Sequence, residues 1–215
     1  MITVCAREND GERPVHCHLV SFEKGSTIYH EGDTSQYWFE VVSGIVRTCR
    51  FLSDGHRQLT GFFYSGDVFG VEAPRYLESA EAVTGILLRR FPASPAHGSD
   101  AAGEERERIL EKALDNARRC IFLFGHRTAA NRVAAFLIAS AARSRAKDGV
   151  ELPMTRSDIA DHLNLTLHTV SRTISDLARQ GLIACHGPQT IRILNSNGLR
   201  IAAGDGDSAP ARRIA

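Results

Sequence analysis

The sequence predicts an α+β protein that combines an N-terminal antiparallel β domain, a long helix and a C-terminal helix-turn-helix with a β wing. Three patterns predict this class. Short apolar segments separated by glycine turns come first, one amphipathic helix pattern follows, and two short helices joined by a tight turn precede two strand patterns. The expected boundaries are a flexible N-terminus (1–14), the β domain (15–98), the long helix (99–126), the winged helix-turn-helix domain (127–203) and a flexible tail (204–215).

Length, net charge and cysteine content limit the class of protein further. The chain has 215 residues, enough for one large or two modest domains with apolar cores. Its formal net charge is +1, so no overall basic field indicates nucleic acid, although a local basic patch is sufficient. No apolar run approaches the roughly 20 residues of a transmembrane helix, and the N-terminus lacks the pattern of a signal peptide. Five scattered cysteines are typical of a reducing compartment, so we expect a cytoplasmic protein without a membrane partner.

The N-terminal half has the pattern of an antiparallel β structure. Short segments of high strand propensity alternate with glycine turns such as Lys24-Gly25, Gly32-Asp33 and Ser43-Gly44. Regular turns between short strands predict a sandwich or a barrel. The expected strands are residues 19–22, 27–29, 38–42, 45–52, 58–64 and 82–91.

A long helix is expected after a loop at residues 92–103, which are rich in Ala, Ser, Pro and Gly. Within the helix, at residues 104–124, apolar residues recur at alternating steps of four and three, which is the seam that a coiled-coil contact requires. We therefore expect a dimer interface there; the alternative is a helix packed on its own domain. The seam consists of Leu110, Leu114, Ala117, Ile121 and Phe124.

Gly125-His126 is a candidate hinge, and residues 128–146 predict a second amphipathic helix. Beyond it lie two helix starts in quick succession. Thr155 is followed by Asp158 at the spacing of a capping box, and Thr166 can cap the next helix. Two helices joined by so short a turn make a helix-turn-helix, whose second helix can enter the major groove of DNA. Each helix is expected to have one apolar face, with Ile159 and Leu163 on the first helix and Val170, Ile174 and Leu177 on the second.

The polar face of the second helix carries the functional prediction. His168, Ser171 and Arg172 point away from the apolar stripe near the N-terminal end of the helix, where base edges are reached in this motif. Arginine can bind guanine in a bidentate manner, and Thr166 and Thr169 could hold phosphates. The alternative is an ordinary surface helix with solvated polar residues. Gly181 is expected to cap this helix, and residues 182–185 and 190–194 predict the two strands of a wing.

The core Leu165-Thr166-x-x-Thr169-Val170-Ser171-Arg172, followed by Gly181-Leu182-Ile183, resembles the winged-helix domain of the Crp/Fnr family of bacterial transcription regulators. The resemblance implies that His168, Ser171 and Arg172 read bases. The Fnr and FixK branches usually have glutamate at the position of His168, which changes the pattern of donors and acceptors offered to the base. The resemblance also implies a second set of residues along the DNA backbone, namely Thr155, Ser157, Thr166, Thr169 and His186.

The glycine turns of the N-terminal half resemble the sensor domain of the same family, a jelly roll like that of cyclic-nucleotide-binding proteins. The run from Asp54 to Phe62 is most similar to the Fnr and FixK branches. In Fnr-type activators the loop at the positions of residues 54–57 helps to contact RNA polymerase, but a solvated hairpin tip is the commoner explanation of such a loop. Family members that bind cyclic nucleotides have a glutamate and an arginine where this chain has Val71 and Glu78, and a carboxylate repels phosphate.

An iron–sulfur cluster requires four thiolates, and the N-terminal region offers Cys5 and Cys17. The triplet His16-Cys17-His18 could supply a metal or haem ligand, but a solvated strand entry is far commoner. Cys185 on the wing is a candidate redox residue, because oxidation beside DNA would add charge or bulk. The interpretation that we prefer for Cys185 is a small buried residue of the wing. We therefore expect no metal and no cofactor.

No phosphate-binding loop, nucleophile elbow or metal-binding helix motif is present, so we expect no enzyme and no catalytic residue. The resemblance implies a homodimeric, FixK-like transcription activator that binds a palindromic operator in double-stranded DNA, a TTGA-type inverted repeat, and contacts RNA polymerase. Two alternatives remain. One is a redox-, haem- or ligand-gated regulator of the same family, and the other is a protein-interaction module that does not bind DNA.

Overall fold

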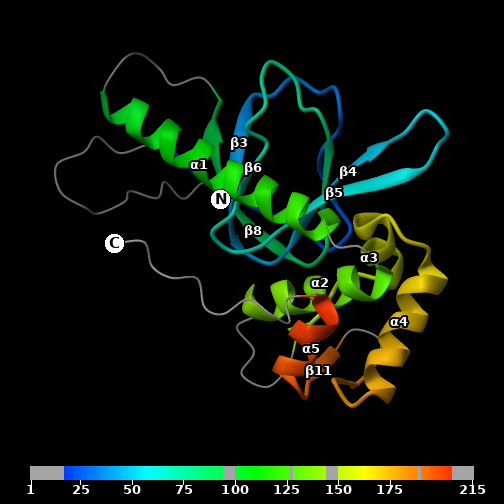
Figure 1. The fold of residues 1–215 in the computed structure, drawn as a ribbon. Helices are drawn as coiled ribbons and strands as arrows, with labels where there is room; N and C mark the ends of the chain where they lie inside the picture. Colours follow the sequence, from blue (N-terminus) through cyan, green and yellow to red (C-terminus); the bar gives the residue numbers. More distant parts are fainter. Residues whose placement is uncertain (1–16, 94–99, 126–127, 144–149, 188–189, 205–215) are drawn as a thin grey trace. The chain divides into compact units, whose positions relative to one another are not determined.

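The structure is a computed structural model that describes residues 17–93, 100–125, 128–143, 150–187 and 190–204 (Figure 1). The chain divides into two compact units, Met1–Cys120 and Ile121–Ala215, and each is described by itself. The flexible ends are expected at residues 1–14 and 204–215, and all of these residues except Gly204 lie outside the described ranges. None of the helices in those ranges is long and apolar enough to cross a membrane.

The first unit contains two four-stranded antiparallel sheets, with strand orders β1-β8-β3-β6 and β2-β7-β4-β5. Apolar side chains from both sheets form one core, in which Val41, Val46 and Leu88 are almost fully buried. Burial of such a side chain stabilises the fold by about 1.5–3 kcal/mol. The strands are β1 (His18–Phe22), β2 (Thr27–Tyr29), β3 (Tyr37–Ser43), β4 (Val46–Phe51), β5 (Arg57–Phe63), β6 (Val68–Phe69), β7 (Ser79–Ala82) and β8 (Ile86–Pro92).

The turn between β3 and β4 shows why glycine marks these turns. Gly44 has a φ of 87°, in the left-handed region that other residues rarely adopt. A Cβ atom at this position would lie 2.5 Å from the carbonyl oxygen of Gly85. Both constraints allow only glycine, so the turn prediction at Ser43-Gly44 is confirmed.

The prediction of one strand over residues 82–91 is wrong. The segment forms the end of β7 and most of β8, which belong to different sheets. Val83, Thr84 and Gly85 connect them, and the backbone N–H of Val83 donates to the carbonyl oxygen of Ile45. Gly85 was the available signal, and the surrounding β-branched residues concealed it. The two-residue strand β6 was also missed because it is too short to show alternation.

The long helix α1 (Asp100–Gly125) lies within the expected segment 99–126 and begins four residues before the helix pattern at residues 104–124. The predicted loop at residues 92–103 is therefore wrong at both ends, since Pro92 also belongs to β8. Within the first unit, Lys112 of α1 lies 3.5 Å from the carboxylate of Glu40, which also pairs with Arg89 at 3.0 Å. Glu40 is buried, so this pairing fixes the helix to the face of the sheet opposite the core.

The second unit contains four helices and a three-stranded sheet within the described ranges. The sheet has the order β10-β11-β9, and Asn131 of α2 donates to the carbonyl oxygen of Ala202 in α5 at 2.8 Å. Neither β9 nor α5 was expected. The elements are α2 (Ala129–Arg143), β9 (Val150–Glu151), α3 (Arg156–Leu163), α4 (Leu167–Arg179), β10 (Ile183–Cys185), β11 (Thr190–Ile193) and α5 (Ser196–Ala203).

Candidate nucleic-acid interface

Helix α3 begins with the predicted capping box. The backbone N–H of Asp158 donates to Oγ1 of Thr155 at 3.1 Å, and the N–H of Thr155 donates to the Asp158 carboxylate at 3.0 Å. Such a cap contributes about 1 kcal/mol to the stability of a helix. The Thr155 hydroxyl accepts in this bond, so its own proton remains available to a phosphate oxygen.

The turn between α3 and α4 is closed by Asn164 in the left-handed conformation, with φ 52° and ψ 53°. Asparagine tolerates this region better than most residues. The N–H of Leu165 donates to the carbonyl oxygen of Ala160 at 2.9 Å, and the Arg132 guanidinium of α2 donates to the carbonyl oxygen of Leu163. The turn is therefore held from within and from α2, and it places α4 at a fixed angle to α3.

Helix α4 starts at its expected cap, because Oγ1 of Thr166 accepts the N–H of Thr169 at 3.1 Å. The two threonine hydroxyls also lie 2.8 Å apart and share one proton. The pair consequently keeps a single O–H that can donate outward, to a phosphate at the positive end of the helix. The expected apolar faces of α3 and α4 are confirmed, since each of their members is at most 2% exposed: Ile159 and Leu163 in α3, and Val170, Ile174 and Leu177 in α4.

The opposite face of α4 carries the three residues expected to read bases. His168 and Arg172 are exposed and Ser171 is half-buried, all within the first two turns. The Arg172 side chain makes no hydrogen bond or ion pair with any described residue, whereas Arg179 further along the helix pairs with Asp176. The structure thus presents one unengaged guanidinium on this face.

Ser175 lies on the same exposed face, one turn beyond Ser171, and the sequence reading did not single it out. Its four-residue spacing from Ser171 was the signal that could have identified it. Oγ of Ser175 donates to the carbonyl oxygen of Ser171 at 3.0 Å. The hydroxyl can therefore still accept a hydrogen bond from outside the helix.

The C-terminal cap of α4 is not Gly181, the residue that the sequence predicts. Gln180 is the cap, and Gly181 follows it with a φ of 71°. The N–H of Gly181 donates to Ala178, and that of Leu182 donates to Leu177, which is a Schellman motif. This motif reverses the chain into β10 and starts the wing.

The wing is an antiparallel hairpin anchored by Ile183 and Ile191, each 1% exposed. Its turn carries His186, which is exposed and whose N–H donates to the carbonyl oxygen of Thr190 at 2.8 Å. Thr155, Ser157 and Thr166 are exposed at the starts of α3 and α4, and Thr169 is half-buried. Their contact with DNA remains a prediction.

The cysteines differ in exposure. Cys185 is exposed on the wing, so the preferred interpretation of a buried residue is wrong. Cys17 and Cys49 are buried, and burial raises the pKa of the Cys49 thiol. Cys5 and His16 lie outside the described residues. Within the described ranges, no three His, Cys, Asp or Glu side chains form a group that could hold a metal ion.

Carboxylates occupy the part of the jelly roll where the resemblance would place a cyclic nucleotide. The Glu78 carboxylate accepts a hydrogen bond from the Thr60 hydroxyl at 2.7 Å. Oε2 of Glu72 is buried and has no hydrogen-bond partner among the described residues. Burial, assisted by the charge of Glu78, raises the pKa of Glu72. Two carboxylates do not suit a phosphodiester, so these residues do not fit a cyclic nucleotide.

A β sandwich followed by a winged helix-turn-helix defines a class of protein, the transcription regulators that join a sensor-type domain to a DNA-binding domain. Comparison with family models agrees in both units. Residues 19–95 match the cyclic nucleotide-binding domain, and residues 131–201 match the Crp-like helix-turn-helix domain. The chain belongs to the Crp/Fnr family of DNA-binding transcription regulators, and it is FixK-like and not an enzyme.

Individual relatives support this assignment. The chain is 36% identical over 186 residues to the nitrogen fixation regulation protein FixK of Rhizobium meliloti (strain 1021), which covers 85% of each sequence. It is 32% identical to the transcriptional activator protein FnrL of Cereibacter sphaeroides, over 86% of this chain and 80% of FnrL. The structure of FixK2 from Bradyrhizobium japonicum superposes with a TM-score of 0.78 at 35% identity, over 91% of this chain and 99% of FixK2.

Proposed function

We propose that the chain is a homodimeric transcription activator that binds a TTGA-type inverted repeat without a cyclic nucleotide or an iron–sulfur cluster. It acts in the cytoplasm, in control of the oxygen-limitation or nitrogen-fixation type, and it contacts RNA polymerase through the hairpin loop at residues 54–57. The observation that carries the proposal is the unengaged Arg172 guanidinium beside Ser171 and His168 on the exposed face of α4.

These three side chains supply the chemistry of base recognition. The Arg172 fork can donate two parallel hydrogen bonds to O6 and N7 of guanine, and Ser171 can bond to either kind of base edge. His168 can donate or accept through one ring nitrogen, whereas a glutamate accepts only. A related half-site with altered preference at the base facing His168 is therefore expected.

A dimer is supported by the surface of α1. Leu110, Leu114 and Ile121 are 51%, 51% and 70% exposed, and Ala117 is also exposed. The side chain of Phe124 lies outside the described ones. An apolar stripe this exposed on one helix favours a helix-to-helix contact with a second copy over packing on its own domain. Two copies related by a two-fold axis would present two wings and two α4 helices to an inverted repeat.

Action without a cyclic nucleotide is supported by the pairing of two arginines of β4, the strand that pairs with β7, which begins directly after Glu78. Arg47 pairs with Glu81 at 2.6 Å, and Arg50 pairs with Glu31 at 3.1 Å. An incoming phosphate would have to displace one of these carboxylates as well as approach two others. The proposal therefore assigns the protein to regulators controlled by their abundance.

The test is fluorescence anisotropy of the air-purified protein, with nothing added, on an inverted TTGA–TCAA repeat and a shuffled duplex at one salt concentration. Selective binding to the repeat supports the proposal. Equal binding to both duplexes contradicts the base preference. Binding that appears only after a thiol reductant is added would favour the redox-gated alternative, which the exposure of Cys185 supports. A protein that binds neither duplex under any condition would point to the interaction module.

A further inference from the structure

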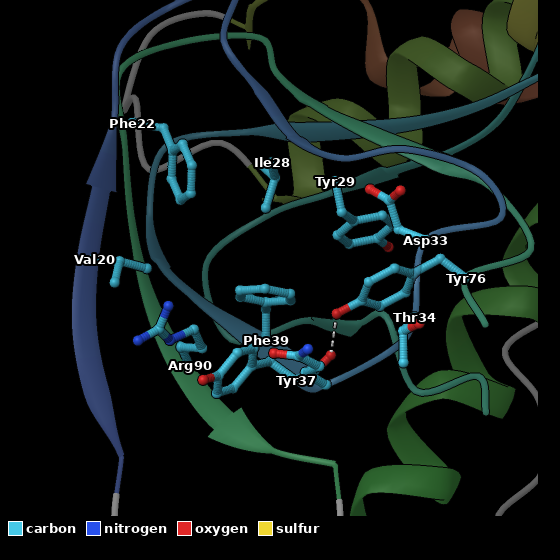
Figure 2. Close-up of a pocket in the computed structure, with 11 residues that line it drawn as sticks. Val20, Phe22, Ile28, Tyr29, Asp33, Thr34, Tyr37, Phe39, Tyr76 and Arg90 are labelled. Carbon is cyan, nitrogen blue, oxygen red and sulfur yellow. Dashed lines mark hydrogen bonds between the residues drawn. The ribbon is translucent and has the colours of Figure 1, made fainter. Parts of the chain in front are cut away.

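A pocket of about 200 Å³, partly open to solvent, lies in the jelly roll, and Figure 2 shows the side chains that line it. Its walls are aromatic and aliphatic, with one basic group. The lining includes Val20 and Phe22 of β1, Ile28 of β2, Tyr37 and Phe39 of β3, and Arg90 of β8. Neither Val71 nor Glu78 lines the cavity, so it is separate from the position expected for a cyclic nucleotide.

Arg90 points toward the interior of the sandwich. In the strand register, His18 of β1, Arg90 of β8 and Phe39 of β3 lie directly opposite one another on one rung. Opposed residues in an antiparallel sheet share a face, and Phe39 belongs to the core at 5% exposure. A guanidinium on this face is unusual, because the next rung inward consists of Val20, Leu88 and Val41.

The guanidinium of this rung has one N–H donor without an acceptor in the described part of the chain. Nε of Arg90 is buried and makes no hydrogen bond to any described residue, and the same holds for Nδ1 of His18. The guanidinium carbon of Arg90 lies 4.2 Å from the centre of the Tyr37 ring. Arg89, the preceding residue, instead pairs with Glu40 on the opposite face. A buried N–H of a charged group without an acceptor is costly, so this rung is suited to an anion.

The remaining groups limit the size and charge of that anion. Asp33 lies at another part of the lining, and its carboxylate accepts the N–H of His30 at 2.9 Å. The Tyr76 hydroxyl is committed to the carbonyl oxygen of Tyr37 at 2.6 Å, as the dashed line in Figure 2 shows. A second negative group on the ligand would meet Asp33, so a single charge is favoured. A cavity of about 150 Å³ holds benzene, so this cavity can hold one ring with a carboxylate.

We propose that the cavity is a binding site for a small monocarboxylate with a compact apolar body of the size of benzoate. The carboxylate accepts hydrogen bonds from the Arg90 guanidinium, and the apolar body contacts Phe39, Val20 and Ile28. All of the residues of the site belong to the first unit, whereas α4 and the wing belong to the second.

The test is isothermal titration calorimetry of the full-length protein, without DNA, with benzoate and with its neutral isostere benzamide. Benzoate should bind saturably with one site per chain, and benzamide at least about tenfold more weakly, because a charge-assisted bond to arginine is lost. Arg90→Gln should lose the same factor for benzoate. Arg50→Gln removes an exposed arginine of the same domain and should leave the affinity unchanged.

A second variant keeps the proposal falsifiable if Arg90→Gln does not fold. Val20→Phe retains the arginine and fills the cavity, so it should abolish the binding of benzoate. Equal affinities of the wild type for benzoate and benzamide, absence of saturable binding, or full binding by a folded Arg90→Gln or Val20→Phe protein would each overturn the proposal.

Discussion

At the scale of single residues, two arginines of α4 differ in what engages them. Arg172 has no side-chain partner among the described residues, and Arg179 pairs with Asp176. Arg172→Ala should weaken binding to the cognate repeat by about 1–3 kcal/mol, or roughly 5- to 150-fold, and relax the preference at one base pair. Anisotropy on the repeat and on duplexes substituted at single positions measures both effects.

Arg179→Ala is the matched control on the same helix and should change the affinity little. A role of Arg172 in holding phosphate makes a different prediction. All duplexes would then lose affinity equally, and the slope of log K against log salt would fall by about one. That result would rule out base reading by Arg172.

Glu72 makes stability depend on pH. Burial raises its pKa, so the folded state holds the proton more strongly than the unfolded state does. The contribution to stability is present below the ordinary pKa and is lost as pH rises through the raised value. The variant Glu72→Gln lacks this loss. The free energy of unfolding of the variant minus that of the wild type should therefore increase from pH 5 to pH 8. Urea denaturation at both pH values measures it, with the exposed Glu23→Gln as control. A relative stability that falls or stays constant with pH would contradict the assignment.

Helix caps could be predicted from the sequence, because they depend on residues close together in the chain. The capping box of Thr155 and Asp158 and the cap at Thr166 were predicted because each depends on spacing along the chain. The exposure of Cys185 could not be predicted, because alternation in a three-residue strand is too short to identify a face. The inward direction of Arg90 was hidden for a related reason. It depends on the register with β1 and β3, which the sequence does not display.

At the scale of elements, α1 has two distinct faces. Ile109 and Asn116 are buried at 9% and 7%, on the side that carries Lys112. The stripe of Leu110, Leu114, Ala117 and Ile121 lies on a different side of the helix and is exposed, although the periodicity predicts apolar contact there. Periodicity could therefore identify the stripe, and only the structure shows that its side chains are exposed.

Leu114→Glu tests whether this stripe joins two copies. Two carboxylates would face each other across a two-fold seam, so the dimer dissociation constant should rise by at least about tenfold. The fold should persist because Leu114 is already half exposed. Sedimentation velocity over a range of concentrations measures the change. Glu111→Lys, a charge change on an exposed flank outside the stripe, is the control. Unaltered association in Leu114→Glu would exclude α1 as the interface.

The failure to predict helix α5 from the sequence has a specific physical cause. Helix α5 was missed because Ser196-Asn197-Gly198 has the composition of a turn, yet Asn195 caps it by accepting the N–H of Gly198 at 2.8 Å. Its burial comes from tertiary contact, since Leu199 and Ala203 are fully buried. Local propensity therefore failed where packing against distant residues decides the structure.

At the scale of the whole molecule, charge is divided unevenly between the units. Residues 121–215 contain 12 Lys and Arg against 7 Asp and Glu, a formal charge of +5. Residues 1–120 contain 14 against 18, a formal charge of −4, so the two values cancel to the overall +1. The net charge of the chain thus conceals a basic unit, the one that carries α4 and the wing. The acidic first unit would be repelled by the DNA backbone, which favours contact through the second unit alone.

A dimer that reads DNA in this way must match the spacing of its two half-sites. Five base pairs inserted between the halves of the repeat rotate one half by about half a turn, away from the face that the second subunit can reach. The affinity for this duplex should fall to that of a single half-site. Ten inserted base pairs restore the face but separate the halves by roughly 34 Å more, so a rigid dimer should not recover. Anisotropy on the three duplexes at one salt concentration measures this. Equal affinities for all of them would mean that each subunit binds independently, and a two-fold dimer would not be the form that binds DNA.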